Sequence, residues 1–197
     1  KRLKLERVTL YQVHWPFSFF MSQETLMNAL ADEVKRGRIE AVGVSNYSAE
    51  QMRQAHQILA DRGVKLASNQ VRYSLITRQI ESSGIVDTAK QLGITILAYS
   101  PLAQGLLTGK YTPDSTEKPT GARWLDPRFS KEGLQKIAPV ISLLRQLAQK
   151  HDRTPAQVAL NWLIAQGNVV AIAGAKTAAQ VQQNAGALGW KLSDDEI

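Results

Sequence analysis

The alternation of short β-forming runs with longer amphipathic segments most constrains the fold of this chain. Strand-like runs occur at residues 8–13, 41–44, 67–71, 94–99 and 169–172; apart from 67–71, which reads ASNQV, they are mainly apolar and contain several β-branched residues. The intervening segments carry helix start signals at Ser22, Ser48 with Gln51, Thr154 with Gln157, Thr177 with Gln180, and Ser193 with Glu196. Strands that alternate with helices build parallel sheets. The sequence therefore predicts an α/β fold.

Polar residues stand at the carboxyl end of every predicted strand, and they help to choose between two α/β architectures. They are His14, Ser45, Asn46, Asn69, Gln70, Ser100 and Lys176, and Lys176 follows the small residues Gly174 and Ala175. A (β/α)₈ barrel builds its active site at this end of its strands. An open doubly wound sheet usually carries a glycine-rich dinucleotide fingerprint, and none follows any predicted strand. These two observations favour part of a barrel.

Composition excludes several classes of function. The chain has no cysteine, which excludes a disulfide framework and a thiolate metal site, and its three histidines lack metal-ligand spacing. No metal is expected. No apolar run approaches the roughly 18 residues of a membrane helix, and no secretory signal is recognisable at the N-terminus. We therefore expect a cytoplasmic protein without a membrane partner, with the plastid stroma as the alternative.

The net charge of +7 has two interpretations. Nucleic-acid binding is one, but the basic residues are scattered among acidic ones, as on solvated helix faces. A basic balance also suits a small anionic ligand such as a phosphorylated cofactor. We expect no nucleic-acid partner.

The stretch "LYQVHWP" delivers His14 where a strand must stop. His14 is either a packing residue whose ring nitrogens are satisfied by the backbone, or a catalytic residue. A neutral imidazole at a strand end can donate an N–H to a carbonyl oxygen that develops negative charge.

Residues 112–131 interrupt the alternation with a long segment rich in proline, glycine and charge. Such a segment is either a disordered insertion or a functional loop. We favour a lid over a ligand, because Trp124 and Phe129 would otherwise be exposed to solvent.

Five stretches appear in order, each at a strand end: "LYQVHWP", "GVSNYS", "ASNQVRYSL", "LAYSPLAQGLLTGKY" and "IAGAKTAAQVQQNAGAL". Together they resemble the aldo-keto reductase family, NADPH-dependent barrels that reduce aldehydes and ketones, and especially its plant-plastid and cyanobacterial, pyridoxal-reductase-like branch. The resemblance implies a single domain over residues 1–197 that forms the last five strand–helix units of a (β/α)₈ TIM barrel. The chain would then match the C-terminal two thirds of a reductase.

The resemblance also implies roles for residues. His14 matches the active-site histidine, and Ser45, Asn46 and Gln70 match positions that bind the nicotinamide carboxamide. Tyr99 matches the aromatic residue on which the nicotinamide stacks. A segment along the diphosphate contains Ser100, Leu102, Gly105 and Lys110.

The adenosine end of NADPH is expected at residues 174–184. This set contains Gly174, Ala175, Lys176, Gln180, Gln183 and Asn184. Lys176 would meet the 2′-phosphate, which favours NADPH/NADP⁺ over NADH, while Gln180 is alternatively only the capping partner of Thr177. Trp15 and Trp124 are expected to shape the site for a small-molecule carbonyl substrate.

The family's proton-donating tyrosine, with its lysine and aspartate, lies before the matched region, and Tyr11, Tyr47 and Tyr73 do not match it. The sequence thus predicts NADPH-dependent reduction of an aldehyde or ketone to an alcohol. The alternative is a catalytically inactive NADP(H)-binding module that acts as a partner-binding or redox-sensing subunit. No oligomeric state is predicted.

Overall fold

The computed structural model describes residues 4–16, 21–114, 119 and 121–197. Its elements, in chain order, are β1 (Val8–Val13), α1 (Gln23–Lys35), β2 (Ile39–Ser45), α2 (Ala49–Ala60), β3 (Leu66–Arg72), α3 (Gln79–Ser82), α4 (Ile85–Leu92), β4 (Thr95–Tyr99), η1 (Ala103–Thr108), η2 (Gly121–Leu125), η3 (Pro127–Phe129), α5 (Lys131–Lys150), α6 (Pro155–Ala165), β5 (Val169–Ile172), α7 (Ala178–Ala185) and η4 (Asp194–Glu196).

Two compact units divide the chain and are described separately. Unit 1 comprises Lys1–Arg72, Arg78–Ala98 and Asn168–Val170, and unit 2 comprises Tyr73–Thr77, Tyr99–Gly167 and Ala171–Ile197. The single domain expected over residues 1–197 stays a prediction.

The five strands form one sheet in the order β1-β2-β3-β4-β5, which is also their order along the chain. β1 pairs in parallel with β2, and β2 in parallel with β3. All five predicted strands are confirmed, with β2 and β3 each extending one or two residues beyond the predicted ends. The α/β fold and its progressive strand order are those of a partial (β/α) barrel.

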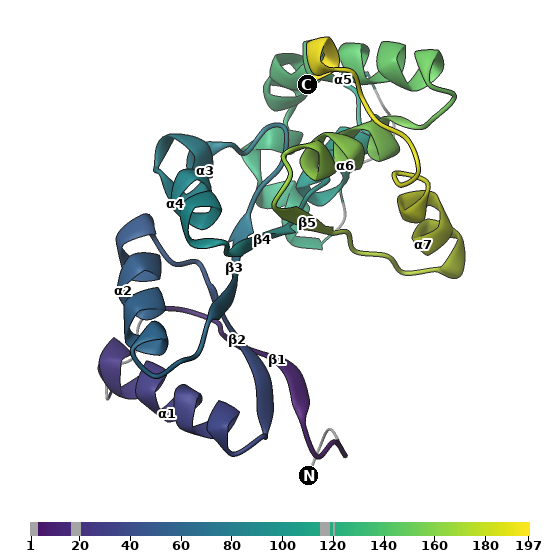
Figure 1. The fold of residues 1–197 in the computed structure, drawn as a ribbon. Coiled ribbons are helices and arrows are strands. Elements are labelled where there is room, and N and C mark those ends of the chain that lie inside the picture. The colour runs from purple at the N-terminus through teal and green to yellow at the C-terminus, as the bar shows by residue number, and fades with distance from the viewer. Residues whose placement is uncertain (1–3, 17–20, 115–118, 120) are drawn as a thin grey trace. The chain divides into compact units, whose positions relative to one another are not determined.

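The core of unit 1 lies between its helices and the sheet. In Figure 1, α1 and α2 lie along the same side of β1–β3. The side chains of Met27, Met52 and Leu59 are fully buried there, as are Val42 and Val44 of β2. Full burial of a side chain of this size contributes about 1.5–3 kcal/mol, so this layer holds the strand ends in place.

Helix starts predicted at Ser22, Ser48, Thr154 and Thr177 are confirmed, whereas Ser193 precedes only the three-residue 3₁₀ turn η4. Ser22 accepts a hydrogen bond from the Thr25 N–H over 3.1 Å. Complete capping boxes form at Ser48 with Gln51 and at Thr154 with Gln157. These boxes satisfy backbone N–H groups that no helical carbonyl can reach.

In unit 2, η2 and η3 occupy part of the segment for which a lid was hypothesised. Phe129 is buried and packs edge-on against Tyr111, with ring centroids 5.2 Å apart. Trp124 is 70% exposed. Residues 115–118 and 120 of this segment lie outside the described residues, and the lid stays a hypothesis.

Within the described ranges, no helix is long and apolar enough to cross a membrane.

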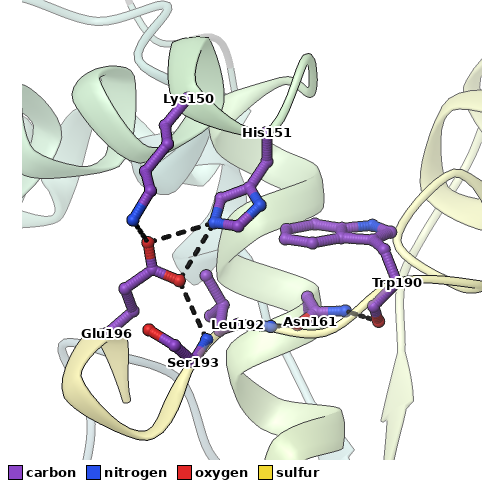
Figure 2. A network of polar contacts seen from close by, with 7 residues as sticks. All are labelled: Lys150, His151, Asn161, Trp190, Leu192, Ser193 and Glu196. Carbon is purple, nitrogen blue, oxygen red and sulfur yellow. Dashed lines mark hydrogen bonds and ion pairs between the residues drawn. The ribbon is translucent and has the colours of Figure 1, made fainter.

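The C-terminal segment of unit 2 is held to α5 and α6 by polar contacts (Figure 2). The buried Asn161 of α6 donates to the carbonyl oxygens of Ala187 and Trp190 and accepts from the Leu192 N–H. Beside it, the Glu196 carboxylate lies 2.7 Å from Lys150 Nζ and 3.0 Å from His151 Nε2. The Ser193 N–H donates to the same carboxylate over 2.9 Å.

These donors change the acidity of Glu196. The hydrogen bond from Lys150, and then that from the Ser193 backbone, lower the pKa of Glu196 from 4.5 to about 2. Because the folded state holds this carboxylate more acidic, its contribution to stability is present above about pH 4.5 and is lost as the pH falls to about 2.

We expect Glu196→Gln to lower the melting temperature near neutral pH, because the amide removes the charge that pairs with Lys150. The difference from wild type should shrink as the pH falls below about 4.5 and disappear near 2. Thermal melts over a pH series measure this, with Asp195→Asn as the control at an exposed neighbouring carboxylate. A deficit that stays constant down to the lowest pH would contradict the assignment.

Candidate functional site

The candidate residues of unit 1 meet at the carboxyl ends of β1, β2 and β3. The Ser45 hydroxyl donates to the Gln70 carbonyl oxygen over 2.9 Å. The Asn46 amide donates to the Ser45 hydroxyl over 3.0 Å and to the His14 carbonyl oxygen over 3.2 Å. The structure thus brings His14, Ser45, Asn46 and Gln70 together, since parallel neighbouring strands end at the same edge.

Asn69 holds the turn that follows β2. Its fully buried side chain donates to the Tyr47 carbonyl oxygen over 3.0 Å and accepts from the Tyr47 N–H over 3.4 Å. The preceding residue, Asn46, has a φ of +61°, a left-handed conformation that asparagine tolerates better than most residues. Asn69 therefore helps to hold Asn46 in this conformation. The sequence placed Asn69 at a strand end but did not indicate this role.

The His14 ring is not packed into the core of unit 1. The residue is exposed, and within the described part of the chain its ring forms no hydrogen bond. The Trp15 ring lies beside it, with the two ring centroids 5.7 Å apart, and Trp15 is 53% exposed. An accessible imidazole of this kind can donate to, or accept from, a ligand.

The three tyrosines considered as substitute acids differ in their exposure. Tyr47 and Tyr73 are each 1% exposed, whereas Tyr11 is 48% exposed. Burial raises the pKa of Tyr47 above its usual 10.0, which makes the phenol a weaker acid. Tyr47 and Tyr73 are therefore closed to a substrate.

In unit 2, Tyr99 ends β4 and a strained turn follows it. Ser100, Ala103 and Gln104 adopt φ values of +53°, +47° and +59°, and Gly105 has a φ of +100°. Left-handed conformations at residues other than glycine cost energy and cluster at functional sites. Leu102 and Gly105 are half-buried, and Lys110 is exposed. The turn lies where the sequence predicts the diphosphate segment.

Two arginines hold this turn from outside. Arg145 of α5 donates to the Gly109 carbonyl oxygen over 3.0 Å. Arg123 of η2 lies 3.2 Å from the Tyr111 hydroxyl oxygen and 3.4 Å from the Gln104 carbonyl oxygen. Side chains of α5 and η2 therefore contact the chain from Gln104 to Tyr111, on the carboxyl-terminal side of the turn.

The predicted adenosine segment links β5 to α7. Thr177 caps α7, with its hydroxyl accepting from the Gln180 N–H over 3.2 Å. The Gln180 side chain accepts from the Lys176 N–H over 2.6 Å instead of the Thr177 N–H that a capping box would use. Only the Thr177 half of the capping box is therefore present, and a contact of Gln180 with a cofactor stays a prediction.

The rest of this segment is open to solvent. Gly174, Ala175, Lys176 and Gln183 are exposed, and Asn184 is half-buried with its amide 3.5 Å from the Gly174 carbonyl oxygen. No residue of α7 is buried. A ligand could therefore reach the Lys176 side chain.

No group of three or more metal-ligating side chains gathers anywhere in the described ranges.

Comparisons with known proteins agree on one family. The sequence profile of the aldo/keto reductase family matches residues 1–197. The chain is 40% identical to the chloroplastic pyridoxal reductase of Arabidopsis thaliana, covering 99% of this chain and 52% of that protein. It is 36% identical to the Schizosaccharomyces pombe aldo-keto reductase yakc, whose name specifies NADP(+), covering 100% of this chain and 57% of that protein.

A solved structure gives the same result. The glycerol dehydrogenase of Gluconobacter oxydans matches 99% of this chain and 57% of its own with a TM-score of 0.88 and 34% identity. The chain thus spans little more than half the length of these relatives. The expected match to the C-terminal two thirds is not confirmed, and the place of the chain within its relatives stays a prediction.

We expect Asn69→Ala to lower the free energy of unfolding by about 1–3 kcal/mol, because it leaves the buried N–H and carbonyl groups of Tyr47 without partners. Urea denaturation measures the loss. Gln54→Ala, which removes an exposed amide from α2, should change stability by less than about 0.5 kcal/mol. Equal losses in both variants would show that Asn69 does not hold the turn.

Proposed function

Because the chain belongs to the aldo/keto reductase family, we propose that its protein reduces an aldehyde or a ketone to an alcohol with NADPH as the hydride source. The cluster of Ser45, Asn46 and Gln70 at one sheet edge is the observation that carries this proposal. A hydroxyl and two side-chain amides together offer both donors and acceptors, and the carboxamide of nicotinamide requires both.

The residues of this cluster differ in burial, and we assign them different roles. Asn46 and Gln70 are half-buried, so a ligand can reach them, whereas Ser45 is 3% exposed. The Ser45 hydroxyl already donates to the backbone carbonyl oxygen of Gln70 and accepts from the Asn46 amide. In our proposal Asn46 and Gln70 contact the carboxamide, and Ser45 acts mainly by holding Asn46.

For unit 2, taken by itself, the family resemblance assigns further residues to NADPH. Tyr99 would stack on the nicotinamide, and the strained turn would border the diphosphate through Ser100, Leu102, Gly105 and Lys110. Lys176 would bind the 2′-phosphate, with Gly174, Ala175, Gln180, Gln183 and Asn184 around the adenosine. The exposure of the Lys176 side chain supports this assignment.

His14 would orient the substrate carbonyl by donating a hydrogen bond to its oxygen. The proton for the product alcohol is assigned, by family resemblance, to a tyrosine that precedes the matched region. The burial of Tyr47 and Tyr73 removes these two as donors, and Tyr11, which is 48% exposed, does not match the family's tyrosine. Trp15 and Trp124 are both exposed, in keeping with a role in substrate contact.

The relatives suggest where to begin the search for a substrate. The Arabidopsis relative is a pyridoxal reductase and the Gluconobacter relative a glycerol dehydrogenase. Pyridoxal reduction and glycerol oxidation are therefore the first reactions to assay, followed by a panel of simple aldehydes and ketones.

We expect Lys176→Ala to weaken NADPH binding about tenfold, equivalent to about 1.4 kcal/mol, because the substitution removes the ammonium group that would bind the 2′-phosphate. NADH binding should not change, since NADH lacks that phosphate. Titration of intrinsic tryptophan fluorescence gives both affinities, and Lys191→Ala serves as the control at an exposed lysine. A parallel loss for both cofactors would remove Lys176 from the 2′-phosphate site.

We expect His14→Ala to lower kcat for aldehyde reduction by roughly 100-fold, the order of magnitude for loss of one donor to a developing oxyanion. The affinity for NADPH should stay within a factor of two of wild type, a difference of about 0.4 kcal/mol. Steady-state consumption of NADPH and the fluorescence titration provide the two measurements. If the wild-type protein binds NADPH but reduces no carbonyl compound, the non-catalytic NADP(H)-binding module becomes the better description.

A further inference from the structure

A polar row crosses the sheet of unit 1 just behind the candidate site. Gln12 of β1 donates through Nε2 to Gln70 Oε1 over 2.9 Å. The Ser68 hydroxyl of β3 in turn donates to Gln12 Oε1 over 3.2 Å. Two of these residues, Gln12 and Ser68, have no assigned role, and Gln12 is a polar residue within an otherwise apolar stretch of strand.

Gly43 of β2 permits this row. In the sheet register Gln12 pairs with Gly43, and Gly43 pairs with Ser68. A Cβ atom at Gly43 would overlap the Ser68 hydroxyl and come within 3.0 Å of Gln12 Cγ. Because Gly43 has no side chain, Gln12 can reach across β2 to β3.

The buried hydroxyl of Ser68 sets the direction of the hydrogen bonds. Ser68 is 3% exposed, and in the described part of the chain its hydroxyl has Gln12 as its one hydrogen-bond partner. If the Gln12 amide were reversed, the Ser68 hydrogen would lose its acceptor, and an unsatisfied buried donor is costly. The Gln12 oxygen therefore faces Ser68, and the Gln12 NH₂ group faces Gln70.

The orientation of the Gln12 amide in turn fixes that of the Gln70 amide. Its oxygen accepts from Gln12, so its NH₂ group is left to face outward from this bond. Gln70 is half-buried, and within the described residues that NH₂ group donates to no protein atom. It is therefore set to bind an acceptor on a ligand.

We propose that Gln12 is a positioning residue, which holds the Gln70 amide so that its NH₂ group, and not its oxygen, meets the carboxamide oxygen of the nicotinamide. This inference rests on the function proposed above. Ser68 and Gly43 support it, the first by orienting Gln12 and the second by leaving room for it.

Gln12→Met tests the inference in the purified protein, because methionine keeps the length of the side chain but removes its donor. We expect NADPH binding to weaken roughly three- to tenfold, the loss of about one neutral hydrogen bond. Binding of 2′-phospho-ADP-ribose, which lacks the nicotinamide, should not change. Gln54→Met on the exposed face of α2 is the matched control.

A combined variant sharpens the result. If Gln12 acts only through Gln70, Gln12→Met should add no further loss of NADPH affinity in a Gln70→Met background. Equal weakening of both ligands by Gln12→Met, or no weakening of either, would overturn the proposal. Where Gln12→Met lowers the melting temperature too far to measure binding, Ser68→Ala makes the same test and should weaken NADPH alone.

The two proposals fail in different ways. A wild-type protein that binds neither NADPH nor 2′-phospho-ADP-ribose would overturn the proposed function and this inference with it. A wild-type protein that binds both, with no selective loss in the Gln12 variant, would overturn only the positioning role.

Discussion

The parallel pairing of β1, β2 and β3 is the constraint on which the candidate site depends. It aligns Val13 with Val44 and Ser45 with Gln70, so that three strands end at one edge. Chemically useful residues at those three ends then become neighbours although they lie far apart in the sequence. Buried helix residues such as Met27 and Met52 hold the strands in that arrangement from one side of the sheet.

Within this sheet, the need to satisfy buried polar groups determines how the side chains point. Asn69 uses its amide to pair with both backbone groups of Tyr47. Ser68 has one hydrogen to donate and gives it to Gln12. In each case an unpaired buried group would cost more than the hydrogen bond contributes on average. The orientation of Gln70 and the conformation of Asn46 are consequences of this requirement.

Much of the fold could be predicted because its signals are local. Apolar runs indicate the strands, and the capping residues Ser48 and Thr154 mark helix starts within a few positions. The strand-end positions of His14 and Asn46 could be predicted for the same reason. The roles of Gln12 and Asn69 could not be predicted, because each depends on a partner more than twenty residues away. A glutamine in an apolar strand was the one signal that could have indicated Gln12. Local patterns also have a limit, because the spacing of Thr177 and Gln180 predicted a capping box, whereas the Gln180 side chain accepts from the Lys176 N–H.

The sequence by itself determined the order of strands and helices, the family resemblance and the residues available for chemistry at each strand end. Those properties follow from residue types and short spacings, which the chain carries before it folds. Only the tertiary structure decided which of these residues touch, which are buried and which way their amides point. The register that pairs Gln12 with Gly43 and Gly43 with Ser68 exists only once three strands have assembled. The hydrogen bond between Gln12 of β1 and Ser68 of β3, which passes over Gly43 of β2, is therefore a property of the fold and not of any one segment.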